Sequence, residues 1–260
     1  MRHIPRKRFG QNFLVDSQII ANIIYAIGPS REDLLVEIGP GLGALTRPLL
    51  QSLRHLHVVE IDRDIVERLR REFSEKNLTI HTGDALEFDF ATFGNDIRVI
   101  GNLPYNISTP LLFHLSGYAH CIRDMHFMLQ KEVVQRMVAV SSTPAYGRLS
   151  VMLQYRFEME QLFIVPPTSF RPVPKVESAV VRMIPRQQPL IDRCKEELFA
   201  HIVVAAFSQR RKTLRNTLHE YLKPEDYALL EIDAGLRAEN LTVPQYAAIT
   251  DYLSKQLVGS

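Results

Sequence analysis

The chain has 260 residues, 46% of them hydrophobic and 23% charged, and a formal net charge of +2. A chain with this many hydrophobic residues can bury a sizeable core, which excludes an intrinsically disordered protein. No apolar run approaches the roughly 18–20 residues of a membrane helix and no signal-peptide core is visible, so no membrane partner is expected. Cys121 and Cys194 match no metal-ligand or redox spacing. We therefore expect reduced thiols in a cytoplasmic protein.

A basic arm, residues 1–16, opens the chain. Its positive residues are Arg2, Arg6, Lys7 and Arg8, and no acidic residue precedes Asp16. Such a segment is typical of a nucleic-acid-binding arm, but also of a targeting peptide. An amphipathic helix is predicted over residues 17–27, capped near Asp16 or Ser17.

Short apolar strands then alternate with helical patterns, which is typical of βαβ units. The predicted strands are 34–38, 57–61, 79–82, 99–101, 126–129, 150–164 and 178–184. For residues 17–186 we predict an α/β, Rossmann-like domain with a mostly parallel seven-stranded sheet and helices on both faces.

Beyond Pro185 the sequence shows only helical patterns, and a small all-α domain is predicted for residues 187–260. The expected helices are 198–207, 209–221, 224–230 and 244–257. Arg211 and Arg215 would lie one turn apart on the second of these helices, where they could follow RNA phosphates. A solvated helix face is the alternative interpretation of these charges.

A glycine-rich segment, Glu37-Ile-Gly-Pro-Gly-Leu-Gly43, follows the first predicted strand. Glycines there allow a sharp turn and a close approach of the backbone to a ligand. The spacing G-x-G-x-G differs from the G-x-G-x-x-G of pyrophosphate binding. It favours a nucleotide-like ligand without a phosphate bridge, of which S-adenosylmethionine (SAM) is the commonest, although a turn without a ligand has the same pattern.

Two acidic residues lie at the ends of the next two strands: Glu60 ends the second predicted strand, and Asp84 comes after the third. Glu60 could accept hydrogen bonds from both ribose hydroxyls of such a ligand, and Asp84 could accept one from an adenine amine. Each has a local alternative, since Asp62 could equally cap the next helix and a Gly-Asp turn is common. The ordered series of glycine loop, Glu and Asp nevertheless predicts a SAM-binding sheet.

The tetrapeptide Asn102-Leu103-Pro104-Tyr105 follows the fourth strand. Methylation of an exocyclic amine is difficult because the nitrogen lone pair is delocalised into the base. The Asn102 side-chain oxygen and the Leu103 carbonyl could grip the N–H groups and free that lone pair. Tyr105 offers a face on which a base could stack.

Eight segments in the same order resemble the KsgA family of ribosomal RNA adenine dimethyltransferases, whose bacterial members are the most similar. They are Phe9-Gly-Gln-Asn-Phe-Leu14, Val36-Glu-Ile-Gly-Pro-Gly-Leu-Gly43, Asn102-Leu-Pro-Tyr-Asn-Ile-Ser108, Gln130-Lys-Glu-Val133, Tyr146-Gly-Arg-Leu-Ser-Val151, Phe170-Arg-Pro-Val-Pro-Lys-Val-Glu-Ser-Ala-Val-Val-Arg182, Arg210-Arg-Lys-Thr-Leu-Arg-Asn216 and Arg237-Ala-Glu-Asn-Leu241. The resemblance implies SAM-dependent dimethylation of N6 of two adjacent adenosines in a 3′-terminal hairpin loop of small-subunit rRNA. It also implies an assembling 30S particle as the substrate and a role in ribosome biogenesis.

The resemblance further implies roles for individual residues. The expected SAM contacts are Asn12, Leu14, Gly39, Gly41, Glu60, Asp84 and Asn102. The expected contacts of the target adenine are Asn102, Leu103, Tyr105 and Phe170, with Phe170 stacking opposite Tyr105. The expected RNA contacts are Arg6, Lys7, Arg8, Arg210, Arg211, Lys212 and Arg215. We expect no metal site, because His114, His120 and His126 have a poor ligand spacing.

Two other classes of function remain open on the sequence alone. One is a ribosome-assembly or transcription factor that keeps the fold without the chemistry, against which the intact glycine loop and tetrapeptide argue. The other is methylation of a DNA adenine or a protein glutamine. Enzymes of that kind usually carry Pro at the position of Leu103, and the helical domain with its basic segment Arg210-Arg-Lys-Thr-Leu-Arg215 also argues against them. A monomer is expected.

Overall fold

The computed structural model describes residues 12–258, so Arg6, Lys7 and Arg8 lie outside the described residues. The chain divides into two compact units. Of the described residues, the first unit contains 12–134 and 160–185, and the second contains 135–159 and 186–258. The second unit thus takes in residues 135–159, which precede the predicted boundary at residue 186.

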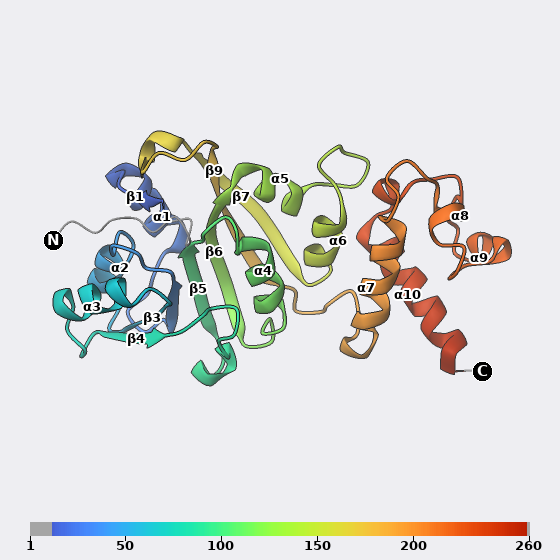
Figure 1. The fold of residues 1–260 in the computed structure, drawn as a ribbon. Helices are drawn as coiled ribbons and strands as arrows, with labels where there is room; N and C mark the ends of the chain where they lie inside the picture. Colours follow the sequence, from blue (N-terminus) through green and yellow to red (C-terminus); the bar gives the residue numbers. More distant parts are fainter. Residues whose placement is uncertain (1–11, 259–260) are drawn as a thin grey trace. The chain divides into compact units, whose positions relative to one another are not determined.

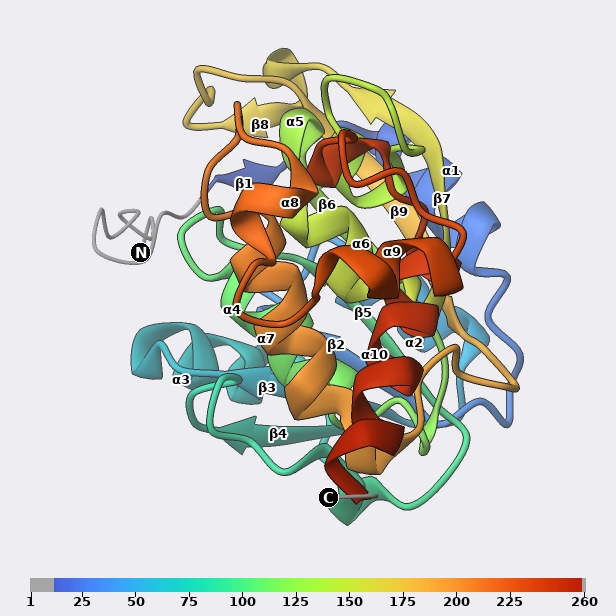
Figure 2. The same ribbon diagram turned by 90° about the vertical axis from the view of Figure 1, so that its right-hand side faces the viewer.

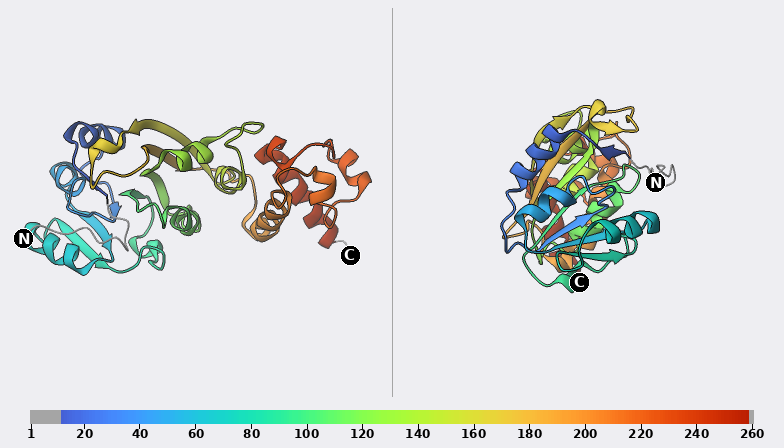
Figure 3. Two further views of the ribbon diagram at one scale, coloured as in Figure 1. Left: turned by 45° about the horizontal axis from the view of Figure 1, so that its top comes forward. Right: turned by 90° about the vertical axis from the view of Figure 1, so that its left-hand side faces the viewer.

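The first unit is built on a seven-stranded sheet with the strand order β4-β3-β2-β5-β6-β9-β7 (Figures 1 and 3). Its strands are β2 (Leu35–Ile38), β3 (Leu56–Glu60), β4 (Leu78–Thr82), β5 (Ile97–Asn102), β6 (Ile122–Gln130), β7 (Phe157–Val165) and β9 (Ser178–Pro185). Neighbours from β4 to β6 are parallel, whereas β9 runs antiparallel to β6. β2 is buried along its whole length, as expected for a parallel strand covered on both faces. The mostly parallel seven-stranded sheet is therefore confirmed.

Four helices of this unit flank these strands in the sequence. Helix α1 (Ser17–Ile27) precedes β2, and α2 (Thr46–Ser52), α3 (Arg63–Glu72) and α4 (Ser108–Ser116) follow β2, β3 and β5. The strand order reverses between β2 and β5, so right-handed crossovers place α2 and α3 on one face and α4 on the other. Such a reversal leaves a crevice at the carboxyl ends of the strands, where α/β proteins bind ligands.

The start of α1 is tied to a distant loop. The predicted cap is confirmed, because Asp16 accepts hydrogen bonds from the backbone N–H groups of Gln18 and Ile19. β1 (Phe13–Leu14) pairs antiparallel with β8 (Phe170–Arg171). The Ser169 hydroxyl also donates to Asp16 Oδ2 at 2.9 Å. These contacts hold the end of the basic arm against the segment that leads into β9.

The predicted strand over residues 150–164 is wrong in its first half. Residues Arg148–Gln154 form helix α6, and β7 begins only at Phe157. The apolar residues there alternate like those of a strand, but short apolar runs fit a helix equally well. The Gln154 side chain donates to the Met137 and Ala139 carbonyls at 2.8 Å each, at the C-terminal end of helix α5 (Lys131–Val138). Those hydrogen bonds stabilise the helix, and the sequence pattern gives no sign of them.

The second unit is mainly helical, as predicted for its C-terminal part (Figure 2). Its further helices are α7 (Glu196–Ala206), α8 (Leu214–Thr217), α9 (Pro224–Leu229) and α10 (Val243–Val258). A core that includes Phe199, Leu214 and Tyr246 joins them. Among residues 12–258, no helix is long and apolar enough to cross a membrane.

The predicted helix over residues 209–221 is wrong, because only the four residues of α8 are α-helical within it. The backbone N–H groups of Leu214 and Arg215 donate to the carbonyls of Leu236 and Ala234. Thr213 also forms a bridge with Arg237. This pairing pulls the segment onto residues 234–237 and leaves Arg211 in a turn, so Arg211 and Arg215 do not share a helix face.

Candidate active site

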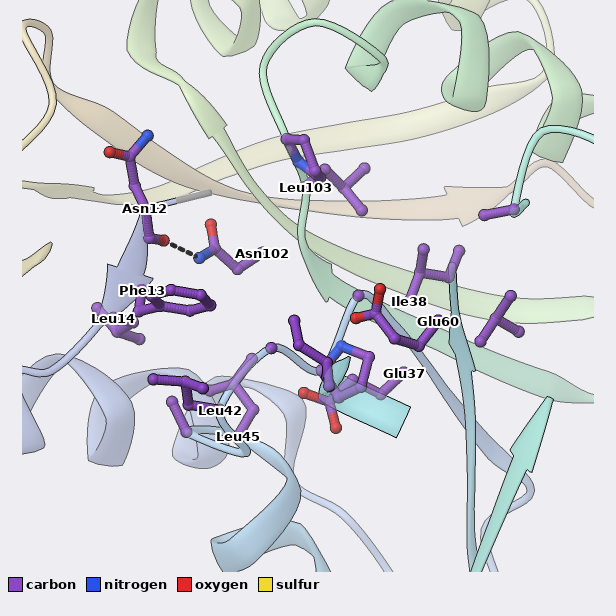
Figure 4. A pocket seen from close by; sticks show the side chains of 18 of the residues that line it. Asn12, Phe13, Leu14, Glu37, Ile38, Leu42, Leu45, Glu60, Asn102 and Leu103 are labelled. Carbon is purple, nitrogen blue, oxygen red and sulfur yellow. Dashed lines mark hydrogen bonds between the residues drawn. The ribbon is translucent and has the colours of Figure 1, made fainter. Parts of the chain in front are cut away.

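A cavity of about 780 Å³ opens at the carboxyl ends of β2, β3 and β5 (Figure 4). It brings together nine of the predicted site residues, which are Asn12, Leu14, Gly39, Gly41, Glu60, Asp84, Asn102, Leu103 and Tyr105. These residues come from five separate segments of the chain. Their convergence on one cavity makes it the candidate site for both the cofactor and the target base.

The glycine loop forms one wall of the cavity. Gly39 and Gly41 have φ angles of +65° and +54°, a conformation that residues with a side chain adopt only with strain. A Cβ atom on Gly41 would lie 3.1 Å from the Phe13 ring. Glycine therefore keeps the loop compact beneath Phe13 and leaves its peptide groups open to a ligand.

Two buried carboxyl groups, those of Glu37 and Glu60, line the cavity. Burial raises the pKa of Glu37 to about 7, although its bond from the Thr46 hydroxyl at 2.7 Å has the opposite effect. Burial likewise raises the pKa of Glu60 to about 7, against the effect of hydrogen bonds from backbone N–H groups such as that of Asp62 at 2.8 Å. A cationic ligand with a ribose diol would compensate the cost of ionising these groups in so buried a place.

The geometry also identifies lining residues that the sequence reasoning missed. Glu37 lies inside the glycine motif, and a carboxylate in a fully buried strand is a signal that could have found it. Ile61 lines the cavity and is 46% exposed, which offers an apolar surface to a ligand base. Asp84 accepts a hydrogen bond from the Leu86 N–H at 2.9 Å, so the turn that it forms is locally fixed.

Asn102 has a defined amide orientation. Its Nδ2 donates to the Asn12 carbonyl at 3.0 Å, as Figure 4 shows. This bond uses the amide nitrogen, so the Asn102 side chain can offer its oxygen to an N–H group in the cavity. The bond to the end of the N-terminal arm therefore orients the Asn102 amide so that its oxygen can act as a hydrogen-bond acceptor.

Leu103 and Tyr105 present different parts to the cavity. The Leu103 side chain is buried and its N–H donates to the Met128 carbonyl at 3.2 Å. The Leu103 carbonyl is thus the group that could accept a hydrogen bond from the target amine, as predicted. Tyr105 is half-buried, and its hydroxyl lies 2.8 Å from Ser178 Oγ. Tyr105 is also among the residues that line the cavity.

Phe170 is not brought to the cavity. Its side chain is 1% exposed and packs in a hydrophobic core cluster, and its backbone pairs with Leu14 in the β1–β8 sheet. A ring enclosed in this way would have to leave the core before it could stack on a base opposite Tyr105.

The basic cluster of the second unit is exposed to solvent. Its members are Arg210, Arg211, Lys212 and Arg215, all of them exposed. Arg237 lies beside them through its bridge to Thr213 and adds a positive charge from a different segment. Sequence spacing alone gives no sign of that neighbour.

The doubly wound sheet, the glycine loop, the acidic residue at the end of β3 and the Asn-Leu-Pro-Tyr turn after β5 together define a SAM-dependent methyltransferase. The family described as "Ribosomal RNA adenine dimethylase" matches residues 2–255. The chain belongs to this family, so it is an rRNA methyltransferase with SAM as its methyl donor, and the resemblance seen in the sequence is confirmed.

Similar proteins agree with this assignment. The chain is 71% identical over 259 residues to "Ribosomal RNA small subunit methyltransferase A" of Nitrosospira multiformis, with both chains covered completely. It is 64% identical to the protein of the same name from Thiobacillus denitrificans, over 97% of this chain and 99% of that one. A solved dimethyladenosine transferase from Plasmodium falciparum is 26% identical, with a TM-score of 0.81, and covers 94% of this chain and 98% of its own.

Proposed function

We propose that the protein dimethylates N6 of two adjacent adenosines in a 3′-terminal hairpin loop of small-subunit rRNA. It would act as a cytoplasmic monomer on the assembling 30S particle and serve ribosome biogenesis. The observation that carries the proposal is the Asn102–Tyr105 turn, which opens into the same cavity as the glycine loop. The relatives named as small-subunit methyltransferases support this substrate over another RNA, over DNA and over protein.

The residues of the cavity fit SAM. Glu60 would accept the two ribose hydroxyls, Asp84 the adenine amine, and the backbone at Gly39 and Gly41 would lie against the ligand. Asn12 and Leu14 would cover it from the arm. When bound, SAM supplies an electrophilic methyl group attached to a sulfonium sulfur.

The Asn102–Tyr105 turn would prepare the adenine for attack. The Asn102 oxygen and the Leu103 carbonyl would accept the two N6–H groups, which favours a tetrahedral nitrogen with an available lone pair. The Tyr105 ring would stack on the base, a contact worth about 1–3 kcal/mol. No strong base is needed, because the methylated nitrogen is acidic enough to lose its proton to water. Rate would come from holding nitrogen and methyl group in line.

The affinity for SAM should rise with pH. In the free protein the pKa values of Glu37 and Glu60 are raised to about 7, so both carboxyls are largely protonated at pH 5.5. A cationic ligand favours their ionised forms, so binding releases protons and strengthens as pH rises. We expect roughly tenfold tighter binding at pH 7.5 than at pH 5.5, measured by titration calorimetry. The Glu60→Gln variant should bind more weakly with a flatter profile; identical slopes would contradict the assignment of Glu60.

The exposed basic cluster should govern binding to the ribosomal particle. Reversal of charge at Arg211 and Arg215 should weaken particle binding at least tenfold. It should also lower, by about two, the steepness with which the logarithm of the binding constant falls with the logarithm of the salt concentration. Affinity for SAM should not change. Lys76→Glu with Lys255→Glu is a matched control, because it alters net charge equally at exposed positions elsewhere. Equal binding by the two reversed proteins would assign the Arg cluster to a solvated surface.

Methyl transfer itself tests the proposed function. Labelled SAM would be supplied with small ribosomal subunits from cells that lack the modification, with fully modified subunits alongside. Dimethyladenosine formed only on the unmodified particles is the expected result. Particle binding without transfer would favour an assembly factor, whereas transfer to another polymer would replace the substrate and keep the chemistry.

A further inference from the structure

Tyr105 is held at both ends by serine hydroxyls. The Ser108 hydroxyl donates to the Tyr105 carbonyl at 3.0 Å and fixes the backbone of the turn. At the far end of the side chain, the phenol oxygen lies 2.8 Å from Ser178 Oγ. A tyrosine side chain has two main torsions, so contacts at both ends leave the ring little freedom.

Ser178 is itself a rigid anchor. It is fully buried at the start of β9, where it pairs with Gln130 of β6. The adjacent Glu177 binds Lys131 twice, through its carbonyl at 3.0 Å and through its carboxylate at 2.7 Å. Ser178 is not among the residues that line the cavity, and its hydroxyl is linked to the cavity through Tyr105.

We propose that Ser178 is a positioning residue for the target base: its hydroxyl fixes the plane of the Tyr105 ring on which the adenine stacks. The proposal rests on the proposed function, in which Tyr105 is the stacking surface. It assigns the hydroxyl of Tyr105 to orientation and its ring to contact with the base.

The environment of the hydroxyl pair explains why the contact should matter. Ser178 is screened from water, and burial raises the pKa of Tyr105, so the phenol is neutral at physiological pH. Loss of the serine hydroxyl would leave a half-buried phenol without its partner, which favours other orientations of the ring. Fewer enzyme molecules would then hold the base in line with the methyl group.

The two hydroxyls can be removed separately. Ser178→Ala and Tyr105→Phe should each lower kcat for methyl transfer to unmodified subunits by roughly five- to tenfold, the effect of one hydrogen bond. SAM affinity should stay constant. If the two hydroxyls act as one contact, the double variant should be no slower than either single variant. Purely structural roles would instead lower the free energy of unfolding and leave kcat unchanged.

Ser150→Ala is the matched control, because Ser150 is a fully buried serine of the second unit whose hydroxyl donates to the Arg136 carbonyl. It should lower thermal stability without changing kcat. Wild-type kcat in Ser178→Ala, or losses that multiply in the double variant, would overturn the inference alone. A wild-type protein that transfers no methyl group to the particle would overturn the proposed function and the inference together. If Ser178→Ala fails to fold, Tyr105→Phe still decides, because the inference requires its kcat to fall.

Discussion

Replacement of Asn102 by alanine should lower the rate of methyl transfer by roughly 10²–10³-fold, the loss seen when one preorganised hydrogen-bonding group is removed from an active site. The substitution removes the side-chain oxygen that would accept an N6–H group of the adenine. It also removes the Nδ2 bond to the Asn12 carbonyl, so the end of the arm loses one anchor. Single-turnover transfer to unmodified small subunits measures the effect.

The fold should survive this change, because Asn102 is only partly buried and its removal creates no large cavity. Particle affinity should remain close to that of the wild type. Asn22→Ala, at an exposed position of α1, serves as the control and should leave transfer unchanged. An Asn102→Ala variant that methylates at nearly the wild-type rate would show that another group holds the amine.

Substitution of Gly101 by alanine should destabilise the first unit and weaken SAM binding together. A Cβ atom at Gly101 would lie 2.6 Å from the Ile38 carbonyl oxygen and 2.9 Å from the Leu103 side chain. The first of these atoms is backbone, so β2 must move where it enters the glycine loop. Overpacking of this kind costs about 1–3 kcal/mol. Urea unfolding and SAM titration give the two quantities.

Gly83→Ala is a useful comparison for the stability measurement. A Cβ atom there would meet nothing within 4 Å, so the free energy of unfolding should change by less than about 0.5 kcal/mol. If both glycine variants were equally stable, the close packing between β5 and the end of β2 would not constrain the site.

The fold could be predicted where local pattern and burial agree. The parallel strands are short apolar runs between turns, and the cap at Asp16 follows from the side-chain chemistry of helix starts. The pattern fails where a distant partner decides the local structure. Residues 148–154 are helical, and the Gln154 side chain bonds to carbonyls at the end of α5. Residues 209–213 are not helical, because the residues that follow them bond to the backbone of residues 234–236.

The candidate site divides in the same way. Glu60, Asp84 and Asn102 could be predicted because each ends or directly follows a strand of a parallel sheet, and the carboxyl ends of such strands meet at one edge. The burial of Phe170 and the contact of Tyr105 with Ser178 depend on long-range pairing. No spacing within the sequence encodes those contacts.

Three hydrogen bonds around the cavity join three segments of the chain in a closed ring. The end of the arm is bonded to the turn through Asn12 and Asn102, and the turn is bonded to β9 through Tyr105 and Ser178. The arm is also bonded to the loop before β9, through Asp16 and Ser169. The bonds that form it join residues 90, 73 and 153 positions apart. Chains are made from the N-terminus, so during synthesis the arm leaves the ribosome first. Its hydrogen bond to the loop at Ser169 can form only after that loop has also been made. A nascent chain therefore cannot complete the site until Ser178 has left the ribosome. The cavity therefore takes its final form only after most of the strands of the sheet, including the start of β9, have been made.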